Sequence, residues 1–385
     1  MLPVQHYLRN EEKETGPALV SESHWRGRVD PEGVLPMKRR TDLPVLLLHN
    51  VDSSWSPDEI AQTLREVSAL ESAIRQEGHP VVNVPVHDSN LKTILSLYDP
   101  DDYVVLNWCE DVPGLAHSDA LVAHTLESLR FSYTGSPPSV LALSWDKPRV
   151  KRLLKKHRVP TPRWKVYTTS KIKDWKEFPA IVKPAGEHCS IGVDKGAVVL
   201  GEDELRARVA YVLEAFHQAA LVEDFIDGRE FHISVLGDKK VTMLPPAEMD
   251  FAAFNDVRDR LCTFDSKFTP GSDHYKEIRL QLPAELTDSE YISLEKTASS
   301  AYSVLGCRDY ARIDIRLRNG VFYVLDVNPN ADISYETSIV CAAEVAGYSY
   351  GAMLSYLINL AARRHPRFGN LCAPETNRRA HGETV

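Results

Sequence analysis

Two short strands joined at residues 319–320 constrain the fold of this chain more than any other feature of its sequence. Before that turn, polar and apolar residues alternate, which predicts a strand with one polar face and one buried face. After the turn, the apolar run "VFYVLDVNPN" carries Asp326 and Asn328 two positions apart, and therefore on one face. A carboxylate and an amide thus lie beside a hydrophobic core, and burying them is costly unless they have partners.

The register of this hairpin decides whether its polar side chains meet. With a tight two-residue turn alone, Asp314 pairs with Leu325, and the two aspartates face opposite sides of the sheet. With one more residue in the loop, or with a β-bulge, Asp314 faces Asp326. Arg312 then faces Asn328. We predict this second register, because desolvating these polar groups unpaired would be costly. Two carboxylates and an amide oxygen at close range predict a Mg²⁺ site shared with nucleotide phosphates.

Composition excludes several classes of protein. With 385 residues, 43% of them hydrophobic, the chain can bury a large core and form two or three domains. Its net charge of −9 arises from well-mixed acidic and basic residues, which argues against a general nucleic-acid binder. No apolar run is long enough to cross a bilayer, and the first residues lack an export signal. The six scattered cysteines fit reduced thiols of a cytoplasmic protein better than disulfides or a zinc site.

The first part of the chain predicts a polar extension followed by a parallel α/β unit. Residues 1–42 are polar and weakly patterned. Residues 56–79 then have helical spacing, with Ser56 as the N-cap and Gly78 beyond the end. Strand, helix and strand in this order predict a parallel sheet with right-handed crossovers. The three strands, each expected to be buried on both faces, are "PVLLLHN", "PVVNVPV" and "DYVVLNW".

Three later segments carry polar residues that are ordinary when each is taken alone. "SWDKPRVKRLLKKHRVPTP" predicts a helix, and most of its basic residues are expected to be solvated. "FPAIVKPAGEHCSIGV" predicts a strand that reaches Lys183, followed by a loop whose N–H groups can approach phosphate oxygens. "ALVEDFIDGREFHISVLG" predicts a surface hairpin that turns at Asp227-Gly228 and carries Glu223 and Glu230 on its two strands.

These three segments are followed along the chain by "TFDSKF" and then by the hairpin that turns at residues 319–320. In this order they resemble the ATP-grasp superfamily and its D-alanine–D-alanine ligase-like branch. The resemblance runs from about residue 44 to about residue 364. It implies an α/β fold of three domains: an N-terminal parallel α/β domain, a central lid lobe, and a C-terminal lobe with an antiparallel sheet. The implied bounds are 1–42 for the extension, 43–143, 144–224 and 225–370 for the three domains, and 371–385 for a polar tail. ATP is then gripped between the last two domains.

The resemblance also implies roles for residues at matching positions. The implied phosphate contacts are Lys147, Lys183, Gly186, Ser190 and Gly192. The implied adenine and ribose contacts are Glu223, the backbone of Asp224, Phe225 and Ile226, and Glu230. Asp314, Asp326 and Asn328 are the implied ligands of two Mg²⁺ ions, with Mn²⁺ as a substitute. Arg312 and Lys267 are the implied catalytic residues, the first at the developing oxyanion and the second near the γ-phosphate.

These residue types suit a ligase. Transfer of the γ-phosphoryl group to a carboxylate gives an acyl phosphate, which an amine can attack, and this transfer requires mainly alignment and charge neutralisation. We therefore predict an ATP-dependent ligase that joins a small-molecule carboxylate to an amine, without a nucleic-acid or membrane partner. The resemblance adds an expected homodimer. Two alternatives stay open: a phosphotransferase acting on a small molecule, and a nucleotide-binding regulator without turnover.

Several positions depart from the D-alanine–D-alanine ligase pattern. The segment "HNVDSSWSPDEI" lacks the acidic signature after the first strand, and "PNADISYETS" replaces the segment that binds the second D-alanine. Cys189 precedes Ser190 where the family has paired serines, Phe268 replaces a lid tyrosine, and Asp326 replaces a glutamate. We therefore expect another acid and another amine as substrates, namely amino acids or small peptides.

Five more residues near these motifs invite a role. We expect His188 to be an ordinary surface histidine and Cys189 a packed loop thiol, and we leave the general base unassigned. Ser334, Tyr335 and Ser338 are candidates to face the acceptor substrate, at the start of a helix predicted within "SYETSIVCAAEVAG".

Overall fold

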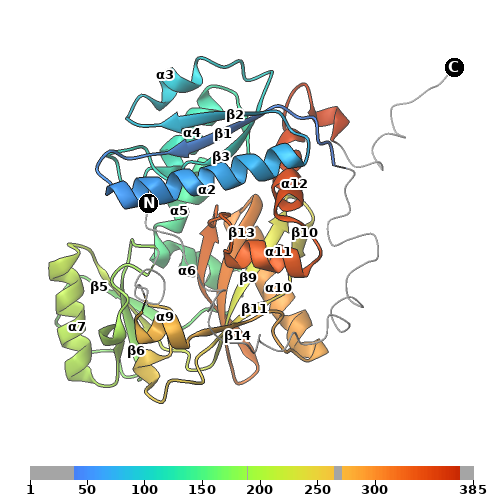
Figure 1. Cartoon of the computed structure of the whole chain (residues 1–385). Coiled ribbons are helices and arrows are strands. Elements are labelled where there is room, and N and C mark those ends of the chain that lie inside the picture. Colours follow the sequence, from blue (N-terminus) through green and yellow to red (C-terminus); the bar gives the residue numbers. More distant parts are fainter. Residues whose placement is uncertain (1–38, 189, 264–270, 373–385) are drawn as a thin grey trace.

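Three β-sheets with their helices make up the protein (Figure 1). The computed structural model describes residues 39–188, 190–263 and 271–372. The first sheet is parallel, and the second and third are antiparallel. This is the mixed α/β architecture that the resemblance implies.

The N-terminal sheet is parallel, as predicted, with strand order β2-β1-β3-β4. Its strands are β1 (Val45–Asn50), β2 (Val81–Val86), β3 (Val104–Trp108) and β4 (Ser132–Tyr133). Its helices are α2 (Pro57–Gln76), α3 (Leu91–Leu95), α4 (Asp119–Ser128) and α5 (Pro138–Ser144). The Ser56 hydroxyl accepts from the Glu59 N–H, and the Glu59 carboxylate accepts from the Ser56 N–H, so the predicted cap is confirmed. β1 and β3 are buried throughout, but β2 is an edge strand with exposed residues, so the prediction of burial on both faces is wrong for β2.

The central sheet has strand order β5-β8-β6-β7 and its own small core. Its strands are β5 (Trp164–Tyr167), β6 (Ala180–Pro184), β7 (Val198–Val199) and β8 (Ala220–Asp224). It is accompanied by α6 (Lys147–Lys156), α7 (Glu202–Ala215) and the short 3-10 helix η1 (Lys195–Ala197). Leu205, Val209 and Val212 of α7 pack against Val182 and Val222 of the sheet.

The C-terminal sheet is the largest, with strand order β12-β11-β9-β13-β14 and β10 paired to β9. Its strands are β9 (Arg229–Gly237), β10 (Val241–Met243), β11 (Ala247–Asp250), β12 (Arg279–Gln281), β13 (Asp309–Arg318) and β14 (Val321–Pro329). The remaining helices are η2 (Val257–Asp259), α9 (Asp273–Glu277), α10 (Asp288–Leu305), α11 (Ser338–Val345), α12 (Tyr350–Ala362) and η3 (Gly369–Leu371). β8 and β9 lie in different sheets, so the predicted hairpin of Glu223 and Glu230 is wrong: the chain crosses here between two sheets.

Two helices, α10 and α12, each cover part of the sheets and leave another sheet face uncovered. α10 covers one face of the C-terminal sheet, where Leu294 and Ala298 join a core with Ile313 and Val324. α12 is buried along its whole length and shares a core with α2 and β3, which joins the C-terminal lobe to the N-terminal sheet. The polar face of the C-terminal sheet is left to meet the central sheet, and the pocket described below lies there.

Candidate active site

The β13–β14 hairpin has the predicted register, and it reaches this register through a bulge. Asn319 and Gly320 have φ angles of 52° and 75° and form a tight turn between Arg318 and Val321, which pair with each other. The register then shifts between Asp314 and Ile315. Beyond that shift Asp314 pairs with Asp326, and Arg312 pairs with Asn328. The prediction of facing aspartates is therefore confirmed, and the turn itself stays short.

The bulge also explains how an aspartate can follow an apolar strand without entering the core. Phe322 and Val324 are buried against α10, and strict alternation would place residue 326 on that same face. The extra residue at the bulge changes the alternation, so Val327 becomes the next core residue. Leu325 and Asp326 both line the pocket.

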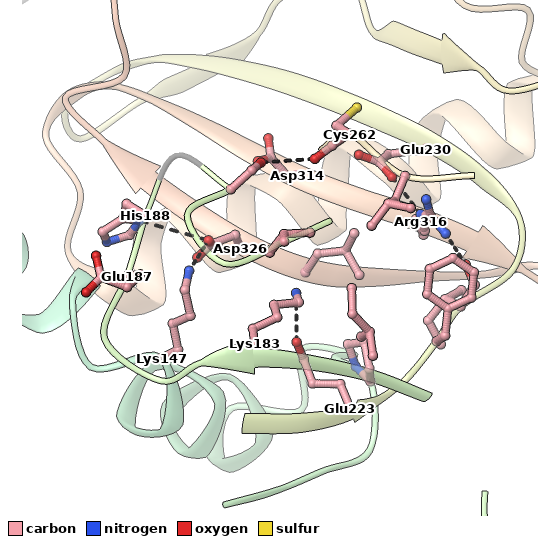
Figure 2. A pocket seen from close by; sticks show the side chains of 18 of the residues that line it. Lys147, Lys183, Glu187, His188, Glu223, Glu230, Cys262, Asp314, Arg316 and Asp326 are labelled. Carbon is pink, nitrogen blue, oxygen red and sulfur yellow. Dashed lines mark hydrogen bonds and ion pairs between the residues drawn. The ribbon is translucent and has the colours of Figure 1, made fainter. Parts of the chain in front are cut away.

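Each aspartate of the hairpin is held by cationic or amide groups, and Figure 2 shows the pair of Asp326 with Lys147. Lys147, at the start of α6, forms an ion pair with Asp326. Asp314 accepts from Arg312 Nε at 2.7 Å and from Asn328 Nδ2 at 3.0 Å. Burial alone would raise the pKa of Asp326, but Lys147 and other nearby cations more than offset this and hold it below its ordinary value. Asp326 is therefore a carboxylate at neutral pH.

A second carboxylate, Glu223 of β8, is almost fully buried between two lysines. Lys183 Nζ lies 2.8 Å from Glu223 Oε2, and Lys151 pairs with the other oxygen. Burial alone would raise the pKa of Glu223, but the two lysines outweigh it and the pKa lies below the ordinary value. Burial, aided by repulsion from Lys183, lowers the pKa of Lys151.

Glu230, at the start of β9, is held in the same way by Arg316 of β13. Arg316 Nε lies 2.6 Å from Glu230 Oε2, and Nη1 donates to the Ile226 carbonyl at 2.9 Å. The guanidinium lies over the ring of Phe225, with centroid distance 4.6 Å. Burial would raise the pKa of Glu230, but the charge of Arg316 reverses this and lowers it strongly.

Most predicted site residues line one pocket between the central and C-terminal sheets. They are Lys147, Lys183, Ser190, Glu223, Asp224, Phe225, Ile226, Glu230, Asp314 and Asp326. Arg312 and Asn328 are not among the lining residues, but both donate hydrogen bonds to Asp314, which lines the pocket. Gly186 donates to Gln218, and Gly192 has a φ of +71° where a Cβ would lie 2.7 Å from Pro184 Cγ, so a side chain does not fit there. Lys267 lies outside the described residues.

Comparison with known proteins places this arrangement in a family. The family described as D-ala D-ala ligase C-terminus matches residues 153–359. The chain belongs to this ATP-grasp ligase family. It is 30% identical over 317 residues to the uncharacterized protein y4sG of Sinorhizobium fredii, covering 80% of this chain and 89% of that protein. It is 28% identical over 309 residues to a D-alanine–D-alanine ligase of Desulforudis audaxviator, covering 78% of this chain and 94% of that protein.

The fold of this ATP-grasp chain agrees with the family. The D-alanine–D-alanine ligase of Bacillus anthracis complexed with ATP superimposes with a TM-score of 0.64 at 21% identity, covering 83% of this chain and 98% of that chain. Within the described residues, no helix is both long and apolar enough to span a membrane.

Two cations that hold the buried carboxylates of the pocket have no predicted role. Lys151 belongs to the helix whose basic residues are mostly expected to be solvated, yet it is buried and donates to Thr161 Oγ1 at 2.9 Å. A helical signal was present, since Lys147, Lys151 and Leu154 lie at i, i+4 and i+7 on one face. Arg316 was expected only on a polar strand face. The exposed Arg149 and Lys155 of α6 agree with the prediction of a solvated face.

The expectation that His188 is a surface histidine is wrong. It lines the pocket, packs edge-on against Trp145 with ring centroids 4.4 Å apart, and places Nδ1 4.0 Å from Asp326 Oδ2. Burial, with help from Lys147, lowers the pKa of His188 to about 4, so the imidazole is neutral at neutral pH. Cys189 lies outside the described residues.

A group of acidic side chains, which we name the acidic recess, lies near the carboxyl end of β3 and is linked to this pocket through Trp145 and His188. We use the name for Glu110, Asp111, Asp119 and Asp332. Asp119 accepts from Trp145 Nε1 at 3.1 Å, which links the recess to His188. Glu110 is exposed, and partial desolvation by neighbouring atoms together with the nearby Asp332 raises the pKa of its carboxyl above the ordinary value. Burial likewise raises the pKa of Asp111 and Asp119.

The three residues suggested for the acceptor substrate lie beside this recess in different ways. Ser334 is buried and donates its hydroxyl to Asp332 Oδ1 at 2.7 Å. Tyr335 is half exposed and contacts the ring of Tyr350. Ser338 is the first residue of α11, so the predicted helix is confirmed there.

Proposed function

We propose that this chain is an ATP-dependent carboxylate–amine ligase that forms an amide bond through an acyl phosphate. The observation that carries the proposal is the bulge-dependent pairing of Asp314 with Asp326 opposite Lys147 and Lys183. Carboxylates on one wall and ammonium groups on the other suit a metal–triphosphate complex, which presents positive and negative charge together. The D-alanine–D-alanine ligases among its relatives support the same reaction class.

The residues of the hairpin end fit Mg²⁺. Asp314, Asp326 and Asn328 offer only oxygen ligands for a hard cation, and both carboxylates are already matched by positive charge. A bound Mg²⁺, or Mn²⁺ in its place, would supply charge neutralisation at the β- and γ-phosphates. We propose that these three residues hold the predicted two ions, with Lys147 leaving Asp326 to contact a phosphate.

The rest of the pocket suits the nucleotide. We propose that Lys183, Ser190 and the Gly186–Gly192 loop contact the phosphates, and that Glu223 contacts the adenine amino group. The N–H groups of Asp224 and Phe225 already donate to Arg163 and Pro179 carbonyls. The N–H of Ile226 is therefore the backbone donor we assign to the adenine ring. Glu230, whose Oε2 is held by Arg316, would accept from the ribose hydroxyls through Oε1.

The ligation step uses the residues around the hairpin. We assign Arg312 to the negative oxygen that develops when the amine attacks the acyl phosphate, because a guanidinium donates two N–H groups to one oxyanion. Lys267 keeps its assignment near the γ-phosphate as a prediction. The acidic recess supports the amine half of the reaction, since no lysine or arginine among the described residues is shown in an ion pair with its carboxylates and an ammonium group would supply a positive charge.

The substrates are proposed to differ from two D-alanines. The acceptor region contains Asp332 and Ser334 in "PNADISYETS", and the recess contributes Glu110 from the N-terminal sheet. These groups suit an amino acid or small peptide with its ammonium group beside the recess.

An isotope experiment tests the reaction class. The protein is incubated with Mg²⁺, ATP and pools of amino acids, with the donor carboxylate labelled with ¹⁸O, and the products are identified by mass. Ligation through an acyl phosphate predicts a dehydrated conjugate, formed only when both substrates are present, and one ¹⁸O in the released phosphate. A stable phosphorylated single substrate would replace the proposal by the phosphotransferase alternative. No ATP turnover with any pool would contradict both.

A further inference from the structure

A cluster of unlike metal-ligating groups lies on the nucleotide-facing wall of the pocket. One ligand atom each of Glu230, His232 and Cys262 lie within 4.8 Å of one another. All three residues line the pocket. The side chains of Glu230 and His232 are each 7% exposed, and their Oε1 and Nε2 atoms are 3.6 Å apart. No other group of three such side chains meets this distance within the described part of the chain.

The fold brings these residues together from two places. Glu230 and His232 are two positions apart on β9 and therefore share the face that looks into the pocket. Cys262 follows η2, and its carbonyl accepts from the Ser190 hydroxyl at 3.0 Å. Figure 2 shows the Cys262 sulfur near the Glu230 carboxylate. The six cysteines seemed unsuited to zinc because they form no C-x-x-C pair, and a site of mixed ligands has no such spacing in the sequence.

The ligand set differs in kind from that of the hairpin end. Thiolate, imidazole and carboxylate together are ligands of Zn²⁺, whereas Mg²⁺ prefers oxygen alone. Arg316 holds the other oxygen of Glu230 at 2.6 Å, as an outer-shell group does for a coordinating carboxylate. Three protein ligands facing a pocket also leave a coordination position for water.

We propose that the nucleotide-free pocket binds Zn²⁺ through Glu230, His232 and Cys262. The three groups need only small shifts to reach bonding distances, because they already lie within 4.8 Å of one another. Binding displaces a proton from the Cys262 thiol and leaves His232 neutral.

The site overlaps the nucleotide position. A Zn²⁺ ion bound to Glu230 Oε1 occupies the space in front of this oxygen, where the ribose hydroxyls are proposed to lie. Zn²⁺ and ATP therefore exclude one another, and Zn²⁺ inhibits competitively with ATP. This consequence rests on the proposed function, whereas Zn²⁺ binding itself does not.

The binding test uses the nucleotide-free full-length protein and Zn²⁺ or Co²⁺ alone. Calorimetric titration of Zn²⁺ is expected to show one site that Cys262→Ser and His232→Gln each weaken by at least about 10²-fold. Cys372→Ser, which removes a thiol elsewhere, and Asp314→Asn, which alters the proposed Mg²⁺ site, are expected to keep the wild-type affinity. Co²⁺ bound to the wild type is expected to show thiolate-to-metal charge-transfer absorption that Cys262→Ser abolishes.

Two outcomes would overturn the site. One is wild-type Zn²⁺ affinity in both Cys262→Ser and His232→Gln, and the other is Co²⁺ binding to the wild type without a thiolate band, which requires no variant to fold. A competition experiment then adds ATP and Mg²⁺ while a metal buffer fixes the free Zn²⁺ concentration, because ATP itself binds Zn²⁺, and the Kd for free Zn²⁺ is expected to rise with ATP. Failure of ATP to bind at all would count against the ligase proposal, while the titrations with Zn²⁺ alone would still decide the metal site.

Discussion

The carboxylates at the end of the β13–β14 hairpin and those of the acidic recess differ in what surrounds them. Asp314 and Asp326 are each paired with a cation, and positive charge holds the pKa of Asp326 below its ordinary value. Asp111 and Asp119 lie near other acids, and burial raises their pKa values. One group lines the pocket and the other is linked to it, yet their electrostatics are opposite.

This difference suggests what each group meets during the reaction. At the hairpin end, Lys147 and Arg312 supply the positive charge that compensates the two aspartates. A metal ion bound with a phosphate can replace these cations, and each carboxylate then still has a positive charge beside it. The recess has no such supply among the described residues. It therefore favours a ligand that brings its own positive charge, as an ammonium group does.

The largest expected effect comes from removing one charge of the hairpin end. Asp314→Asn should lower Mg²⁺-dependent ATP turnover on the order of 10³-fold, because a metal ligand is lost at the phosphates. The amide has the same shape and its oxygen can still accept from Arg312 Nε, but the second position loses its contacts with Arg312 Nη2 and Asn328 Nδ2, so the variant should fold with a moderately lower melting temperature. Steady-state kinetics and thermal unfolding measure both. Asp203→Asn, on the fully exposed side chain of Asp203, is the control and should change neither turnover nor melting temperature. Wild-type turnover in Asp314→Asn would contradict the assignment of Asp314 as a metal ligand.

The second prediction tests whether the stability of the folded protein depends on the cation that is paired with a buried carboxylate. Lys151→Ala leaves Glu223 buried with only Lys183, and breaking a buried ion pair costs about 3–5 kcal/mol in the free energy of unfolding. Lys155→Ala, on the exposed face of the same helix, should cost less than about 0.5 kcal/mol. Urea denaturation measures both variants. Equal stability of the two would show that the buried lysine does not compensate Glu223.

The smallest effect concerns the recess and depends on pH. The pKa of Glu110 is higher in the folded protein than in the unfolded chain, so wild-type stability falls as pH rises from the unfolded pKa through the folded one. Glu110→Gln cannot ionise and should match the wild type at pH 4. At pH 8.5 its melting temperature should be higher by roughly 2 °C, a small gain because Glu110 retains solvent contact. Glu295→Gln, exposed on α10, is the control; a pH-independent difference would contradict the assigned pKa shift.

The hairpin was predictable because its information is local. The alternation before residue 319, the turn residues and the cost of burying Asp326 together select one register. The choice of a bulge over a longer loop was not predictable, since both place Asp314 opposite Asp326. The position of Lys151 on α6 carried a weak helical signal, but its partner Glu223 lies on β8, about 70 residues later in the chain.

The recess and the mixed-ligand cluster were not predictable, because they depend on long-range packing. Glu110 follows β3 and Asp332 follows β14, and they come near each other through the packing of the C-terminal lobe on the N-terminal sheet and the hydrogen bond from Trp108 Nε1 to Asp332 Oδ1 at 3.5 Å. His188 was misassigned for the same reason, since Trp145 buries it from another segment. Glu223 and Glu230 lie in separate sheets, which their spacing in the sequence did not indicate.

The most direct test is a crystal structure with an ATP analogue and Mn²⁺, with data collected at the manganese absorption edge. The account predicts anomalous density at Asp314, Asp326 and Asn328, in contact with the β- and γ-phosphates, and Lys147 moved from Asp326 to a phosphate. Nucleotide bound in the pocket with manganese away from these three residues would contradict it.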